Sequence, residues 1–131
     1  MRYAFLFLIG ILCFSCNVAN ARTLTVVSTA YCSCKLCCGK SPSHPAYGIT
    51  ASGKKASQGT VAVDPKVIPL GSRLKIEGFD DTIFRAEDTG RAIKKNRIDI
   101  WHASHRSALI YGKKQLTITV LPEPPQKIRK S

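Results

Sequence analysis

Acidic residues are scarce in this sequence. Its 131 residues include 8 Asp and Glu against 20 Lys and Arg, which gives a formal net charge of +12. The sequence also lacks an internal repeat, a glycine-rich phosphate loop and a heptad pattern, which excludes a solenoid, a P-loop nucleotide-binding enzyme and a coiled coil. The length allows one domain. With so few acids, any acidic side chain away from a turn is a candidate for function.

No apolar run is long enough to cross a membrane. The longest, residues 3–14, is well short of the roughly 20 residues that a bilayer requires. It follows Arg2 and precedes the small-x-small site Ala19-Asn20-Ala21, which is the pattern of a secretory signal. We therefore predict a signal peptide over residues 1–21, cleaved after Ala21. Cys16 leaves lipid attachment as an alternative.

Removal of this segment leaves a domain at residues 22–121 and a basic, proline-containing tail at residues 122–131. An exported protein would work in the periplasm, in the cell wall or outside the cell. A small domain this basic is attracted to polyanions. Export argues against nucleic acid, whereas bacterial wall polymers carry carboxylates and phosphates. We expect anionic cell-wall polymers as partners, no nucleic acid, no stable membrane span and a monomer.

Cysteine is concentrated in one short stretch beyond the signal, at Cys32, Cys34, Cys37 and Cys38. In an exported chain this density predicts disulfides. Sequence does not choose among the three pairings, although backbone geometry disfavours a bond between the adjacent pair. The alternative is a compact zinc site of four thiolates. We favour two disulfides because zinc ligands usually come from two separated pairs.

Histidine offers little support for a metal site. His102 and His105 are three residues apart, but no third ligand is evident from the sequence beside them. We expect no metal and no cofactor. Trp101 is either part of the core or a platform for a sugar ring.

Alternating and β-branched segments predict an all-β fold. Strands are expected at residues 23–29, 59–64, 72–77, 82–88, 97–101 and 115–121. Ser104 as a helix cap and Gly112 as a stop predict one short helix between them. Residues 32–55 lack periodicity and predict a long functional loop. Many short strands with Gly and Pro turns favour a small sandwich or barrel.

Three aspartates lie in or at the end of apolar strands, namely Asp64, Asp88 and Asp99. A carboxylate among apolar residues is costly unless it is partnered or needed. Asp64 and Asp88 precede turn residues, so each could simply cap a turn. Asp99 lies between two isoleucines with no turn residue nearby. If the three converge, repulsion raises at least one pKa, as the acid of a glycosidic cleavage requires.

Six ordered motifs cover residues 29 to about 120. They are Thr29-Ala30-Tyr31-Cys32, Gly48–Gly53, Gly59–Pro65, Val67–Gly71, Ala86–Gly90 with Ala92-Ile93-Lys94, and Arg97–Trp101. Together they resemble the three-aspartate (3D) domain, which is related to the catalytic barrel of membrane-bound lytic transglycosylase A.

The resemblance implies a six-stranded double-psi β-barrel with one short helix. It also implies cleavage of peptidoglycan glycan strands between N-acetylmuramic acid and N-acetylglucosamine, leaving 1,6-anhydro ends. In the related transglycosylase the catalytic Asp follows another Asp by eleven residues, which is the separation of Asp88 and Asp99 here. The resemblance therefore assigns the acid–base role to Asp99, with Asp88 and Asp64 as supporting acids.

The resemblance also implies substrate contacts, at Thr50, Ser52 and Thr89. Arg91 departs from the family pattern, which has a second glycine there, and would either crowd the groove or bind an anionic group. Two other functions stay open. One is a two-carboxylate glycoside hydrolase. The other is a non-catalytic wall-binding module that grips glycan with Lys, Arg and Trp101.

Overall fold

The fold is that of a computed structural model, which describes residues 20–124. Most of the expected signal segment, including Cys16, and residues 125–131 of the expected tail lie outside the described residues. Among residues 20–124, no helix is both long enough and apolar enough to cross a membrane.

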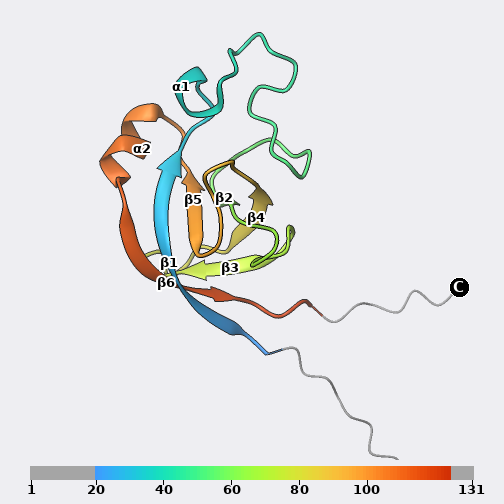
Figure 1. The fold of residues 1–131 in the computed structure, drawn as a ribbon, viewed down its shortest axis with the longest axis vertical. Coiled ribbons are helices and arrows are strands. Elements are labelled where there is room, and N and C mark those ends of the chain that lie inside the picture. The colour runs from blue at the N-terminus through green and yellow to red at the C-terminus, as the bar shows by residue number, and fades with distance from the viewer. Residues whose placement is uncertain (1–19, 125–131) are drawn as a thin grey trace, which may run out of the picture.

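Six strands close into a barrel (Figure 1). They are β1 Arg22–Tyr31, β2 Thr60–Ala62, β3 Arg73–Ile76, β4 Phe84–Asp88, β5 Arg97–Trp101 and β6 Lys114–Val120. Their order around the barrel is β1-β5-β2-β4-β3-β6, in which β1/β5 and β2/β4 pair in parallel and the other neighbours antiparallel. The predicted all-β, six-stranded double-psi barrel is confirmed. Within residues 20–124, each of the six strands therefore has a paired neighbour on both sides.

Strand alternation builds the core. Val26, Val61, Ile98, Ile100 and Ile118 are almost fully buried and point into the barrel. The residues between them, such as Ala62 and Asp99, therefore face the outside. This outer face is where loops can build a site on a rigid support.

The predicted short helix is present as α2, His105–Tyr111. Ser104 caps it by accepting a hydrogen bond from the backbone N–H of Ser107, and Gly112 ends it. A second helix, α1 at Lys35–Cys38, was not predicted because a single turn shows no hydrophobic period. It ends at Gly39, whose φ of 70° suits glycine. Figure 1 shows α1 and the loop after it gathered at one end of the barrel, next to α2.

Candidate active site

Asp88 and Asp99 flank one small residue of the barrel wall. Ala62 on β2 pairs with Asp99 on β5 and, on its other side, with Asp88 on β4. A register shift between Val61 and Ala62 lets β4 skip Glu87 and present Asp88 instead. The two carboxylates thus come from neighbouring strands on either side of one alanine.

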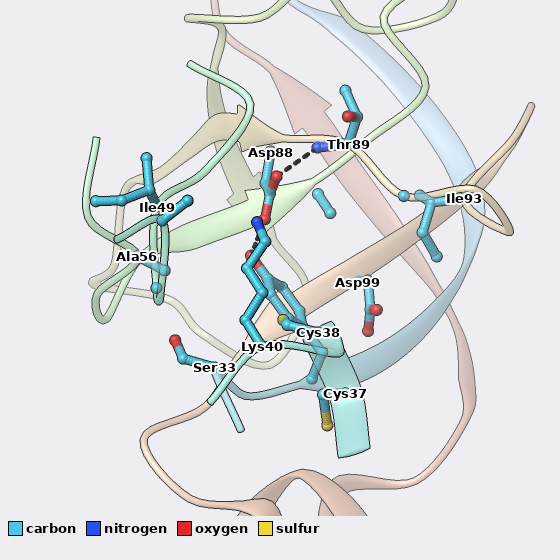
Figure 2. A pocket seen from close by; sticks show the side chains of 15 residues that line it. Ser33, Cys37, Cys38, Lys40, Ile49, Ala56, Asp88, Thr89, Ile93 and Asp99 are labelled. Carbon is cyan, nitrogen blue, oxygen red and sulfur yellow. Dashed lines mark hydrogen bonds between the residues drawn. The ribbon is translucent and has the colours of Figure 1, made fainter. Parts of the chain in front are cut away.

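These residues line a pocket of about 230 Å³ on the outer face of the barrel (Figure 2). Its floor includes Ala62 and Asp99. Its walls come from the end of β1, from the loop between β1 and β2, and from the turn that follows Asp88. Tyr31, Lys40 and Ile93 are among the wall residues. The long loop expected at residues 32–55 therefore covers the candidate site.

Asp99 is half-buried in this pocket and is held by one strong contact. Its Oδ1 accepts a hydrogen bond of 3.0 Å from Thr29 Oγ1. Burial raises the pKa of Asp99 to about 6, with a smaller contribution from Asp88 in the same direction. The Thr29 hydrogen bond and the charge of Arg97 oppose that rise. Near neutral pH, Asp99 can therefore both give and take a proton.

Asp88 is fixed by three donors. Its Oδ1 accepts from the backbone N–H of Ala51 at 3.0 Å and of Thr89 at 2.9 Å, and its Oδ2 accepts from the Tyr31 hydroxyl at 2.7 Å. Burial and this hydrogen bond raise the pKa of Tyr31 far above its ordinary value, so the phenol stays a donor. The Asp88 carboxylate is thus held in one orientation at the pocket wall.

Asp64 does not join the other two aspartates. It is buried outside the residues that line the pocket, and its carboxylate accepts the backbone N–H of Lys95 at 2.9 Å and of Lys66 at 3.1 Å. These two hydrogen bonds, that of Lys95 foremost, lower its pKa. The structure therefore places Asp64 as a cap between two turns, and it is not among the groups that shift the pKa of Asp99.

Of the expected substrate contacts, only Thr89 lines the pocket. Thr50 is buried and bonds Ser52 and the Lys54 carbonyl, while Ser52 itself is exposed. Arg91 is exposed outside the lining. Trp101 donates from Nε1 to Ser33 Oγ at 3.0 Å and lies outside this pocket, against Tyr31, Ala62 and Ile93.

Thr29 and Tyr31 are site residues that were not predicted from the sequence. Both lie on β1, two residues apart, so they share the outer face of the barrel with Asp99. Thr29 faces Asp99 directly across the β1/β5 pair. The polar groups of Thr29 and Tyr31 interrupt the apolar positions of β1, which could have marked them as candidates. The sequence did not show, however, that β1 pairs with the strand of Asp99. Lys40 carried no signal of this kind because it lies in the long loop.

The four cysteines differ from expectation, because all are free thiols in the structure. The sulfur atoms of Cys32 and Cys37 lie 3.6 Å apart, whereas a disulfide requires about 2.05 Å. Instead of pairing, three thiols gather around His105 of α2, which lies 3.6 Å from Cys34 and 3.4 Å from Cys37 by its Nδ1 atom. These four residues form a set that could hold a metal ion.

The protein is thus a small closed β-barrel that carries two carboxylates in a pocket on its outer face. The family model for the 3D domain matches residues 59–122. This segment is therefore a 3D domain, and the resemblance seen in the sequence motifs is confirmed.

Two curated relatives come from Bacillus subtilis strain 168. YabE, named for a proposed role in cell wall shaping, is 41% identical over 106 residues, which are 80% of this chain and 24% of YabE. The cell wall-binding protein YocH is 37% identical over 109 residues, which are 80% of this chain and 34% of YocH. The chain therefore spans about a quarter to a third of the length of these relatives.

Two solved structures are similar at lower identity. A crystal structure of the lytic transglycosylase MltA from Escherichia coli is 23% identical with a TM-score of 0.49, over 57% of this chain and 28% of MltA. The lytic transglycosylase LtgG of Burkholderia pseudomallei is 24% identical with a TM-score of 0.48, over 65% of this chain and 29% of LtgG.

Proposed function

We propose that this protein is a peptidoglycan lytic transglycosylase in which Asp99 is the acid and then the base. The observation that carries the proposal is the setting of Asp99. It is a half-buried carboxyl with a pKa of about 6, on the floor of a pocket that a second carboxylate also lines. A general acid works best when its pKa lies near the working pH.

The proposed reaction uses one residue twice. Protonated Asp99 gives its proton to the glycosidic oxygen, and the bond from that oxygen to C1 of N-acetylmuramic acid breaks. Positive charge develops at C1, where the Asp88 carboxylate stabilises it. Asp99, now a carboxylate, takes the proton from the C6 hydroxyl of the same sugar. The C6 oxygen then bonds to C1, which closes a 1,6-anhydro ring and returns Asp99 to its acid form.

Other pocket residues position these groups. The Tyr31 hydroxyl and two backbone N–H groups hold Asp88 rigidly, so that little reorganisation is needed when charge develops. Lys40 offers a cation to the carboxylates that peptidoglycan carries. Thr89 offers a hydroxyl to the sugar.

The relatives support a role in the cell wall. YabE is named for cell wall shaping and YocH for cell wall binding. These names agree with the proposal that this protein is exported and contacts peptidoglycan and the anionic polymers of the cell wall. The excess of Lys and Arg over acids agrees with the same partners.

The test is mass spectrometry of digested peptidoglycan. Wild-type protein should release muropeptides with 1,6-anhydro ends, and Asp99→Asn should release none while keeping its fold. Asp64→Asn is the matched control, because it removes the same charge outside the pocket and should still release the anhydro product. Ordinary reducing ends would instead indicate a hydrolase that uses water and two carboxylates.

A wall-binding module without catalysis is the second candidate. It is favoured by the name of YocH and by the net charge of +12. In that case the protein should co-sediment with insoluble peptidoglycan, and salt should weaken the binding strongly. Asp99→Asn would leave this binding unchanged, and no new chain ends would form.

A further inference from the structure

We propose that Cys32, Cys34, Cys37 and His105 bind a single Zn²⁺ ion that holds the long loop against the barrel. One ligand atom from each residue lies within 4.8 Å of all the others. Neither Asp88 nor Asp99 is among the ligands, and the proposal does not depend on the proposed activity.

Three of the six distances between the ligand atoms are close to the edges of a metal tetrahedron. With Zn–S bonds of about 2.3 Å and a Zn–N bond of about 2.05 Å, the sulfur atoms should lie about 3.8 Å apart and sulfur about 3.6 Å from nitrogen. The Cys32–Cys37 sulfur separation is 3.6 Å. The His105 nitrogen lies 3.6 Å from Cys34 and 3.4 Å from Cys37. The other three distances are within 4.8 Å, so the four atoms are close enough together to bind one ion.

The backbone around the cysteines supports this arrangement. The N–H groups of Cys37 and Cys38 both donate to the Cys34 carbonyl, at 3.1 and 2.9 Å, which folds the Cys-x-x-Cys segment into a tight turn. Two cysteines at this spacing on one turn are common in structural zinc sites. Trp101 fixes Ser33, between the first two ligands, through the hydrogen bond to its hydroxyl.

Three thiolates and one imidazole favour zinc over other ions. Soft sulfur ligands in a tetrahedron exclude magnesium and calcium, which require oxygen. Four protein ligands close the coordination shell, so the ion would be structural and would leave no position for a substrate. It would tie the end of β1 and α1 to the first residue of α2. Because Cys37 also lines the pocket, the ion would fix one wall of the candidate active site.

Cys38 provides an internal control. It is a neighbour of the ligands in sequence, but its thiol donates to the Cys32 carbonyl at 3.2 Å, and it is not part of the ligand set. Cys38→Ser should therefore keep the ion, whereas Cys34→Ser and His105→Gln should lose most of it.

The experiment measures metal content and coordination of the full chain. The purified protein is assayed by elemental analysis for zinc, iron and copper. Protein stripped with a chelator under reducing conditions is then reloaded with Zn²⁺ alone and assayed again. X-ray absorption of the wild type should give three sulfur ligands at about 2.3 Å and one nitrogen at about 2.0–2.1 Å. Loading with Co²⁺ should give the visible bands of a tetrahedral thiolate site in wild type and in Cys38→Ser.

Several results would overturn the proposal. One is a purified wild-type protein that contains no zinc and has two disulfides by mass spectrometry, and another is a failure to bind zinc after reloading. Iron or copper in place of zinc would have the same consequence. Four sulfur ligands, or loss of zinc in Cys38→Ser with retention in His105→Gln, would also overturn the ligand assignment. The wild-type absorption spectrum decides the question even if a ligand variant does not fold.

Discussion

Thr29 donates a hydrogen bond of 3.0 Å from its Oγ1 to Oδ1 of Asp99, the residue directly opposite it across the parallel pair β1/β5. A hydrogen bond to a carboxylate favours the charged form, whereas burial favours the neutral form. Burial is the larger effect, and the pKa of Asp99 rises to about 6. The balance between these two effects governs the expected pH dependence.

Activity should fall as pH rises through about 6, the pKa of Asp99. The free enzyme needs the protonated acid, so kcat/KM should decrease about tenfold for each further pH unit. Release of anhydro-muropeptides, measured across a pH series at constant ionic strength, checks this. A rate that stays constant through that region would mean that the ionisation of Asp99 does not control the reaction.

Thr29→Val should move this limb of the profile to higher pH. The substitution keeps the shape of the side chain but removes the hydroxyl that lowers the pKa of Asp99. Thr29→Ser keeps a hydroxyl and should leave the limb near its original position. If Thr29→Val moved the limb to lower pH, the direction assigned to this hydrogen bond would be incorrect.

Asp99→Asn should stabilise the fold at neutral and alkaline pH. The pKa of Asp99 is about 6 in the folded protein against 3.8 for an unperturbed Asp carboxyl, so folding favours its protonated form. That contribution is present below about 4 and is lost as pH rises through about 6. Above this range the wild type bears the cost of a half-buried charge, and the amide should add about 1–2 kcal/mol to the free energy of unfolding.

Urea denaturation of both proteins at about pH 8 and about pH 4 measures this difference. The gain should be largest at the higher pH and nearly vanish at the lower one. An equal gain at both values would point to packing and not to the charge.

Ala62→Leu should block the pocket without breaking the barrel. The side chain of residue 62 faces outward between Asp88 and Asp99, so the added atoms would enter the space where the reacting bond must lie. We expect a loss of activity of at least about tenfold and an overpacking cost of about 1–3 kcal/mol. Ala62→Gly leaves the pocket open and should retain activity. Full activity in Ala62→Leu would place the substrate elsewhere.

Asp64→Asn should lower stability and leave the chemistry intact. An amide offers one oxygen where the structure needs two acceptors, for the N–H groups of Lys66 and Lys95. The folded pKa of Asp64 is lowered, so its stabilisation is present above the ordinary Asp pKa of 3.8 and is lost as pH falls through the folded pKa. The thermal midpoints of variant and wild type should therefore converge in acid. Loss of anhydro product with an intact fold would show Asp64 to be catalytic.

Much of the fold was open to prediction from local patterns. Alternating and β-branched segments predicted the six strands, and a cap and a stop predicted α2. The predicted β2 was too long, because the strand ends at Ala62 and the Asp64 carbonyl already accepts the turn hydrogen bonds of Val67 and Ile68. The predicted β1 was too short. The turn α1 escaped prediction because four residues carry no periodicity.

The sequence by itself determined the strands and the scarcity of acids. It also marked Asp88 and Asp99, eleven positions apart, as candidate catalytic acids. Each of these features depends on neighbours along the chain. Only the tertiary structure decided that Asp64 caps turns, whereas Asp88 and Asp99 lie on either side of Ala62. The reason is that strand register sets which side chains are neighbours. The same reason explains His105. It lies about seventy residues from the cysteines in sequence, and only the parallel pairing of β1 with β5 and the position of α2 after it bring that imidazole to the three thiols.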